Sequence, residues 1–189
     1  MTIMTDGEIL EAIAAGEIEI SDFDETRLQG CSYDCLLGDN FWYQVNKDKL
    51  QYWKPMLEKV PSGEAYNTVF FEPGHFALAH TQEFVRVSSS IQFTVHTTST
   101  ARRHGLDVCA SAGWGDPGYC NRVTLELKAD AVLELPRRAI VCQIAFHRLS
   151  RPVLRPYRGS YGSYASIAEA AQHWKPEHML PKPIKAGEP

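Results

Sequence analysis

Four side chains between residues 99 and 126 could do chemistry together. Ser99 and Arg103 are four positions apart, so on a helix they would share one face. A hydroxyl, a guanidinium and the free amides of a helix start suit a phosphate group. Asp116 precedes Pro-Gly in a glycine-bounded loop, and Glu126 stands between two leucines, where a carboxylate is disfavoured unless it has a partner or a task. This spacing predicts a nucleotide pocket with a carboxylate at its base end.

Each of these residues also has a structural interpretation. Ser99 could be only a helix cap, and Arg103 only a surface charge. Asp116 is an ordinary residue before a Pro-Gly turn, and a strand glutamate such as Glu126 is more often exposed or salt-bridged. The motifs of zinc cytidine deaminases, H-E-x-x-H metalloproteases and Walker nucleotide-binding loops are absent from the sequence. A Cys–His nucleophile stays open, although no cysteine is marked out for it.

The composition limits the class of protein. A chain of 189 residues that is 44% hydrophobic is large enough to bury one core. Its net charge of −4 gives no broad basic field, so long nucleic acid is not an expected partner. Because no apolar run has membrane-spanning length and no leader is seen, we expect a cytoplasmic protein with no membrane partner. The five cysteines are an odd number with no CxxC pair, and we expect buried, reduced thiols.

Two helices are expected near the ends of the chain. Thr5 and Glu8 have the spacing of a capping box, and Gly16 can end the helix that follows. A second helical pattern covers residues 166–174. We expect one domain over residues 1–174, followed over residues 175–189 by a mobile, proline-rich tail with little to bury.

The chain between these helices predicts β structure. Short apolar stretches alternate with Gly, Pro, Asn or Ser, as a sandwich or a distorted barrel requires. Residues 46–66 form a long excursion that could be a lid or a subunit contact. The expected strands span residues 41–45, 68–72, 75–80, 83–87, 91–95, 107–111, 122–127, 131–135 and 139–147.

Six short motifs follow one another along this pattern. They are S-Y-D-C-L-L-G-D-N-F at 32–41, E-P-G-H-F-A-L-A-H-T-Q-E at 72–83, S-T-A-R-R-H-G-L at 99–106, D-P-G at 116–118 with L-E at 125–126, I-V-C-Q-I-A-F at 140–146, and R-P-Y at 155–157. In this order they resemble the dCTP deaminase/dUTPase family, and specifically its dCTP deaminase branch. The resemblance covers residues 5–165.

The resemblance implies a fold and an assembly. The fold is mainly β, a distorted jelly-roll or β-barrel of the dUTPase-like type with short N-terminal and C-terminal helices. The assembly is a homotrimer whose active sites are built from neighbouring subunits. The implied reaction deaminates the cytosine ring of a deoxynucleotide without zinc or another metal at the base, with magnesium carried on the nucleotide phosphates.

The resemblance also implies roles for particular residues. Glu126 would be the general base, Ser99 and Arg103 would contact phosphates, and Asp116 would lie at the sugar, which makes these four the expected catalytic group. Backbone at residues 112, 124 and 125 would read the base edge. The expected substrate-binding residues are Thr98, Thr100, Arg102, Ala112, Trp114, Thr124, Leu125, Gln143 and Tyr157.

Three positions depart from the family pattern. Thr98 stands where the signature has a leading basic residue, and Asn121 replaces the glycine that follows D-P-G-x-x. The segment after Tyr157 lacks the lysine and glutamine that close over the triphosphate. Losing two cationic contacts weakens phosphate binding unless other arginines, such as Arg102, Arg155 or Arg158, replace them.

The leading interpretation is hydrolytic deamination of dCTP to dUTP and ammonia. Ala112-Gly113-Trp114 resembles the bifunctional members that also hydrolyse the triphosphate to dUMP, which makes a bifunctional enzyme one alternative. The departures leave two others. One is a regulatory or nucleotide-binding protein without turnover, and the other is an enzyme for a modified or less phosphorylated pyrimidine nucleotide.

Overall fold

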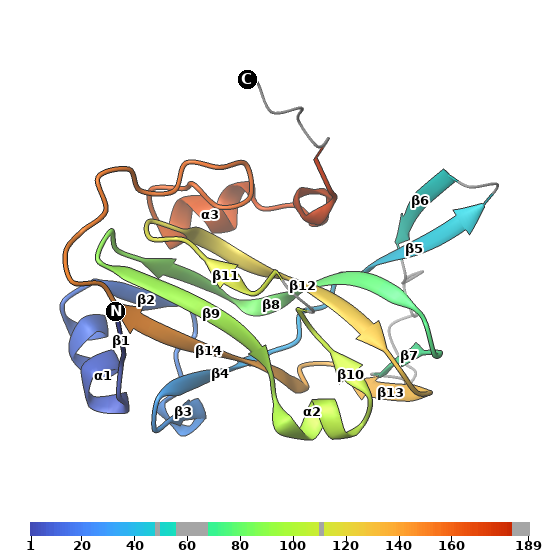
Figure 1. Ribbon diagram of the computed structural model, residues 1–189. Helices are drawn as coiled ribbons and strands as arrows, with labels where there is room; N and C mark the ends of the chain where they lie inside the picture. The colour runs from blue at the N-terminus through green and yellow to red at the C-terminus, as the bar shows by residue number, and fades with distance from the viewer. Residues whose placement is uncertain (48–49, 56–67, 110–111, 183–189) are drawn as a thin grey trace.

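The computed structural model describes residues 1–47, 50–55, 68–109 and 112–182, and it is mainly β (Figure 1). The helices are α1 (Asp6–Ala14), α2 (Ser99–Arg103) and α3 (Ile167–His173), with the 3-10 turns η1 (Glu25–Arg27) and η2 (Pro176–Met179). The strands are β1 (Thr2–Ile3), β2 (Ile18–Ile20), β3 (Leu28–Gln29), β4 (Ser32–Leu36), β5 (Trp42–Lys47), β6 (Leu50–Pro55), β7 (Thr68–Phe71), β8 (Phe76–Val87), β9 (Ile91–Thr97), β10 (Leu106–Asp107), β11 (Trp114–Gly115), β12 (Cys120–Ala129), β13 (Leu133–Pro136) and β14 (Ile140–Arg148).

Within the described residues, the strands form two six-stranded antiparallel sheets and one small pair. The first sheet has the order β11-β9-β14-β4-β3, with β1 also paired to β14. The second has the order β10-β12-β8-β5-β6, with β2 also paired to β8. Strands β7 and β13 form the separate pair. The buried apolar side chains of both sheets join one continuous core, so the two sheets fold as a unit.

Strand β12 has one face toward the core and one face toward the candidate site. Along this strand Val123, Leu125 and Leu127 are buried, while Thr124 and Glu126 between them are only half-buried. Successive side chains of a strand point to opposite faces, so the apolar residues enter the core and the polar ones face away from it. This alternation, visible in the sequence, fixes the direction of Glu126.

The largest difference from the expected strands is β8. The sequence predicts separate strands over 75–80 and 83–87, but one strand runs unbroken from Phe76 to Val87. No turn forms at the join, because Thr81 is fully buried and its hydroxyl donates to the carbonyl of Glu83. The strand expected over 107–111 is also too long: β10 ends at Asp107, and residues 110–111 lie outside the described residues.

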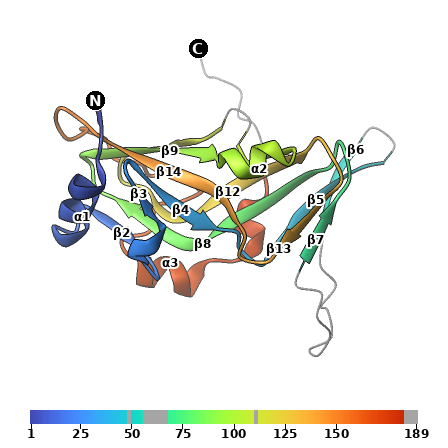
Figure 2. The same ribbon diagram turned by 90° about the horizontal axis from the view of Figure 1, so that it is seen from below.

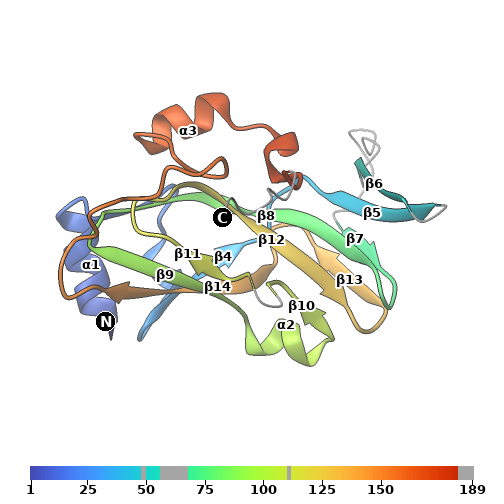
Figure 3. The ribbon, with the colours of Figure 1, turned by 45° about the horizontal axis from the view of Figure 1, so that its top comes forward.

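The two helices expected from the sequence are confirmed. Thr5 and Glu8 close the capping box of α1, and Ser166 caps α3 by accepting from the amide of Glu169. Helices α2 and α3 lie on opposite sides of the strands in all three views (Figures 1, 2 and 3). The β5–β6 hairpin projects from one end of the molecule, and it accounts for the described part of the 46–66 excursion; residues 48–49 and 56–66 lie outside the described residues.

The first part of the expected tail contacts the rest of the fold. Met179 is only 3% exposed, and the indole N–H of Trp42 donates to the carbonyl of Pro176 over 2.9 Å. The amide of Lys182 also donates to the hydroxyl of Tyr161. Residues 175–182, which the sequence assigns to the tail, are therefore packed, and residues 183–189 lie outside the described residues.

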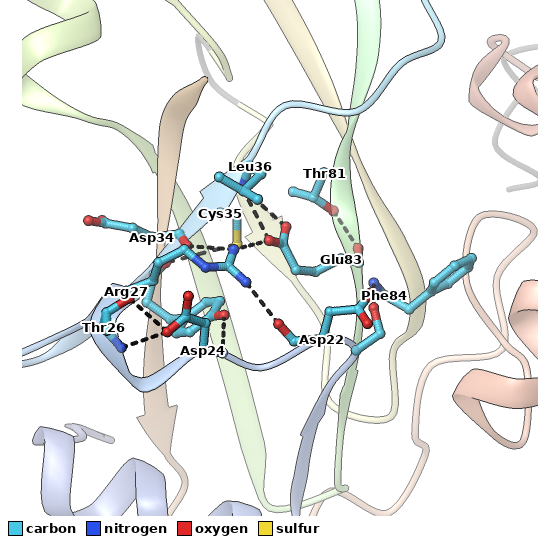
Figure 4. A network of polar contacts seen from close by, with 12 residues as sticks. Asp22, Asp24, Thr26, Arg27, Asp34, Cys35, Leu36, Thr81, Glu83 and Phe84 are labelled. Carbon is cyan, nitrogen blue, oxygen red and sulfur yellow. Dashed lines mark hydrogen bonds and ion pairs between the residues drawn. The ribbon is translucent and has the colours of Figure 1, made fainter. Parts of the chain in front are cut away.

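A buried ion pair ties the two sheets together next to β4 (Figure 4). Arg27 of η1 is paired with Glu83 of β8, whose side chain is 1% exposed. Both carboxylate oxygens of Glu83 also accept from the amide of Leu36 in β4, and the Arg27 guanidinium donates to the carbonyls of Asp22 and Asp34. Every charge of the pair thus has several partners, as a buried pair needs.

Candidate functional site

A cavity of 390 Å³ opens between strands β8, β9, β11 and β12 and is bordered by the C-terminal segment. Six of the residues expected at the site line it: Ala112, Trp114, Asp116, Thr124, Glu126 and Tyr157. The other lining residues are Phe76, Leu78, Phe93, Val95, Gly113, Gly115, Tyr119, Val123, Tyr161, Met179 and Pro181. The cavity is therefore mostly apolar, with a few polar groups, as small-molecule sites are.

Glu126 is held in this cavity by a strand that is bonded on both sides. Its amide donates to the carbonyl of Val108 over 2.8 Å, and in β8 it is paired with Leu78. Within the part of the chain that the structure describes, its carboxylate makes no hydrogen bond or ion pair. The side chain is half-buried, so a rigid backbone presents a carboxylate that is available to a ligand.

Asp116, in contrast, has a partner inside the cavity. The indole N–H of Trp114 donates to its Oδ1 over 3.1 Å. The carbonyl of Asp116 accepts from the amide of Tyr119, which closes the Asp-Pro-Gly turn. One carboxylate oxygen is thus engaged by the protein, and the other is left for a ligand.

The C-terminal segment packs against this turn. The amide of Tyr157 donates to the carbonyl of Pro117 over 2.8 Å. Gly118 has φ +89°, and a Cβ at this position would lie 2.7 Å from Pro156, so only glycine allows the close approach. Burial raises the pKa of the Tyr157 phenol, the amide of Tyr161 opposes that shift, and the charge of Asp116 adds to it. The phenol therefore stays neutral and can donate or accept.

Asn121, which departs from the family pattern, and its neighbour Arg122 hold this segment in place. Asn121 is buried, and its side-chain amide donates to the carbonyl of Tyr161 over 2.9 Å. The Arg122 guanidinium carbon lies 4.6 Å from the ring centre of Phe84 and 4.9 Å from that of Trp174, just after α3. These contacts fasten the C-terminal segment to β12 and β8.

The residues expected to bind phosphate do not line the cavity of this chain. Ser99, Thr100 and Arg103 are exposed on α2, which contacts β10 and β14. Thr98 is the N-cap, since its hydroxyl accepts from the amide of Ala101, so the cap is one residue earlier than Ser99. Arg102 pairs with Asp130 over 2.6 Å, and that partner already occupies its guanidinium.

Two other expected residues also lie apart from the cavity. The side chain of Leu125 is fully buried in the core, which leaves only its backbone to meet a ligand, as the sequence expects. Gln143 lies on β14, paired between Asp34 and His96, and it is not among the residues that line the cavity. The backbone amide of Ala112 donates to the carbonyl of Cys109. The backbone group that Ala112 can still offer to a ligand is therefore its own carbonyl.

The charges of the cavity are all negative. Of its described lining residues, Asp116 and Glu126 are the ionisable acids, and none is Lys, Arg or His. Nowhere in the described ranges do three or more His, Cys, Asp or Glu side chains gather into a group that could hold a metal ion. Phosphates therefore find no cation within this cavity and must meet one from outside it.

The structure argues against a cysteine nucleophile. Burial raises the pKa of the Cys109 thiol to about 12 and that of Cys120 to about 11, so both stay protonated at neutral pH. Cys35 and Cys142 are fully buried, and all five thiols are free. Cys31 is exposed, which corrects the expectation that every cysteine is buried.

Several cavity residues were missed from the sequence. Leu78 lies opposite Glu126 in the sheet, and period-2 alternation would have found it once the strand pairing was known. Met179 comes from the tail that was expected to be mobile, and Tyr161 lies in the expected domain, beyond the last of the six motifs. No local sequence pattern indicates that they return to the cavity.

The fold places this chain beside a solved protein of known structure. The same mainly β fold occurs in the solved 2′-deoxycytidine 5′-triphosphate deaminase of Agrobacterium tumefaciens, with a TM-score of 0.59 and 16% identity. That alignment covers 78% of this chain and 48% of the other, so this chain spans about half of the solved one. No described helix is long and apolar enough to cross a bilayer.

Sequence comparison then identifies the family. A family model described as dCTP deaminase-like matches residues 3–149. The dUMP-forming dCTP deaminase of Methanobrevibacter smithii is 35% identical over 170 residues, which cover 83% of this chain and 86% of that protein. The protein of the same description from Dictyoglomus thermophilum is 31% identical over 172 residues, covering 85% and 88%. The chain belongs to the dCTP deaminase-like family.

Proposed function

We propose that this protein is an aminohydrolase that converts dCTP and water to dUTP and ammonia, with Glu126 as the general base. The observation that carries the proposal is the carboxylate of Glu126, which has no partner within the described residues and borders a mostly apolar cavity. The relatives named as dCTP deaminases support it, because this chain aligns with most of the length of each of them. A nucleotide substrate and reduced thiols fit a cytoplasmic location.

In the proposed reaction, Glu126 takes a proton from a water molecule as the water oxygen bonds to C4 of the cytosine ring, and it passes that proton to N3. The same carboxylate then takes the proton of the new C4 hydroxyl and gives it to the amino group, so that the C4–N bond breaks, ammonia leaves and the 4-keto group of dUTP forms. One side chain can serve as base and then as acid because the proton enters and leaves at adjacent atoms. Backbone groups at Ala112, Thr124 and Leu125 would distinguish the 4-amino from the 4-keto group, since the wrong base leaves a polar group unpaired.

The phosphates need cations that the cavity does not contain. We infer a homotrimer with a jelly-roll-like subunit, in which Ser99 and Arg103 on α2 of one copy reach the cavity of the next. Thr98, Thr100 and Gln143 would belong to the same shared surface, and Arg102 would first have to leave Asp130. The substrate in this scheme is the magnesium complex of the nucleotide.

A second candidate is continued hydrolysis of the product to dUMP and pyrophosphate. The relatives carry dUMP-forming names, and the Ala112-Gly113-Trp114 stretch borders the cavity beside Asp116. A carboxylate close to where the phosphates must enter could activate the second water.

The test measures both products separately. The protein is incubated with magnesium and dCTP, dCMP or dUTP, and ammonia and pyrophosphate are followed over time. We expect ammonia from dCTP, whereas pyrophosphate in addition supports the second candidate. If neither product forms but nucleotide raises the melting temperature, the protein is a binding member without turnover.

The variant Glu126→Gln distinguishes the loss of the general base from the loss of substrate binding. It keeps the size of the side chain but cannot take a proton, so we expect ammonia release to fall at least about a hundredfold, the lower range for a general base. Binding of dCTP should persist. Glu134→Gln, on the exposed face of β13, is the matched control. Unchanged turnover in the Glu126 variant would remove this residue from the mechanism.

A further inference from the structure

Trp114 is placed unlike a packing residue. Its side chain is 61% exposed, although a tryptophan that only stabilised the fold would be buried. The two residues beside it are glycines, and both are sterically required. A Cβ at Gly113 would lie 2.4 Å from the carbonyl oxygen of Val95, and one at Gly115 would lie 2.1 Å from the ring of Phe93.

These glycines let β11 lie against β9, where Trp114 is paired with Thr94. The backbone on both sides of Trp114 is therefore fixed, and the indole projects from a defined point at the edge of the cavity. From there its N–H reaches Oδ1 of Asp116 over 3.1 Å. A hydrogen bond to a charged group is stronger than a neutral one, so this contact restricts the rotation of the carboxylate.

The chemistry of the cavity limits what Asp116 can bind. Its carboxylate repels phosphate oxygens, and the described cavity lining offers no Lys, Arg or His to compensate. A carboxylate accepts hydrogen bonds, and the donor that a deoxynucleotide offers away from its base and phosphates is the free sugar hydroxyl. With Oδ1 held by the indole, Oδ2 is the oxygen left for that hydroxyl.

We propose that Trp114 is a positioning residue that fixes Asp116, so that its free oxygen accepts the sugar hydroxyl of the bound nucleotide. The proposal rests on the proposed function for the identity of the ligand. It assigns to Trp114 a role in sugar recognition that is separate from contact with the base.

The test compares two substrates that differ only in this hydroxyl: dCTP and its 2′,3′-dideoxy analogue. For Trp114→Phe, which keeps an aromatic ring but loses the N–H, kcat/KM and Kd are measured with each nucleotide. We expect the preference of the wild type for the hydroxyl-bearing nucleotide to fall about tenfold, the loss of one oriented charged hydrogen bond. In an Asp116→Ala background the same substitution should change this preference no further.

The matched control is Trp42→Phe, which also removes an indole hydrogen bond, here to Pro176 in the C-terminal segment that borders the cavity. Loosening that segment should change the binding of both nucleotides alike. We expect no change in the preference. If Trp114→Phe weakens both nucleotides equally, Trp114 is a wall for the base, and the proposal is overturned. If the wild type binds both but releases no ammonia, the proposed function fails, while the two Kd values still decide the role of Trp114.

A spectroscopic measurement needs no activity. The chain has four tryptophans, and the indole N–H resonance missing from Trp114→Phe identifies that of Trp114. We expect Asp116→Ala to shift that resonance, because its acceptor is gone, and to leave the other indole resonances in place. An unmoved Trp114 resonance would contradict the hydrogen bond on which the proposal depends.

Discussion

Glu126 shows how one position of strand register decides what a residue can do. It lies between Leu125 and Leu127, which are fully buried, so the alternation of β12 turns it toward the cavity. A slip of one residue would put the carboxylate in the core and a leucine in the cavity. The pattern Leu-Glu-Leu in the sequence was therefore enough to predict that Glu126 leaves the core.

The buried pair of Arg27 and Glu83 should control stability. Glu83→Gln leaves the Arg27 guanidinium buried without its counter-charge, and we expect a loss of about 3–5 kcal/mol in the free energy of unfolding. Urea denaturation followed by circular dichroism measures this loss.

The double variant Arg27→Met with Glu83→Leu provides the comparison. It removes both charges, so its loss of stability should be smaller than the sum of the losses measured for Arg27→Met alone and Glu83→Leu alone. Additive losses would show that the two side chains do not act as a pair.

His80 should make stability depend on pH. Burial lowers its pKa to about 4, the carbonyl of Thr81 opposes that shift, and the charge of Arg122 adds to it. The unfolded chain then takes up a proton first as the pH falls, so this contribution is complete above the ordinary histidine pKa and is lost toward pH 4. Between pH 7 and pH 5 we expect a loss on the order of 2 kcal/mol from this group.

The measurement is urea denaturation of the wild type and of His80→Gln at both pH values. The variant lacks the titrating ring, so the difference between the two proteins should shrink at pH 5. His147 contributes in the same direction, because burial lowers its pKa too, but it is common to both proteins. A constant difference between them would rule out His80 as the source.

The site could be predicted from the sequence only where one segment supplies it. Asp116, Trp114 and Glu126 lie within 13 residues of each other, and the structure brings all three to one cavity. Ser99 and Arg103 were expected at the same ligand, but within one chain they lie on α2 outside that cavity. Helical spacing shows which residues share a face, and it does not show which surface that face meets.

At the scale of elements, local signals decided what could be predicted. The caps of α1 and α3 are short-range patterns, and both helices form where those patterns lie. The sequence divided β8 in two, because Thr81 and Gln82 look polar enough for a turn. In the structure the strand continues through these residues, and its pairing with β12 only shifts register between Arg122 and Thr124, which no local pattern could show.

The docking of α3 depends on Arg122, whose guanidinium packs against Phe84 and Trp174. Arg122→Met keeps the stem of the side chain but removes the charge, so we expect a loss of about 1–2 kcal/mol, the range for a partly buried cation over aromatic rings. Hydrogen exchange of residues 166–179 should become about tenfold faster, while β12 stays protected.

Arg151→Met, on the exposed loop after β14, is the matched control and should change neither measurement. If exchange in β12 rises as much as exchange in α3, Arg122 supports the whole sheet and does not dock the helix selectively.

At the scale of the whole molecule, the proposed homotrimer, in which α2 of one copy reaches the cavity of the next, predicts complementation between subunits. Arg103→Ala and Glu126→Gln should each be nearly inactive alone. Refolded together in equal amounts, they should regain about a quarter of wild-type ammonia release, because one cavity in four then pairs an intact Glu126 with a neighbour's intact Arg103.

Glu126→Gln mixed with Asp116→Ala is the control, since both residues line the cavity of a single chain. This mixture should regain nothing. Recovery in neither mixture, or a monomer in sedimentation, would place Arg103 outside the working site.

The two walls of the cavity are built differently. Glu126 is carried by a strand bonded on both sides, whereas the opposite wall is the C-terminal segment, attached through a few contacts at Pro117, Asn121 and Trp42. An inhibitor designed for this cavity would have to match the first wall as it stands. Selectivity over related enzymes is better sought at the second wall, because the segment that forms it departs from the family pattern after Tyr157.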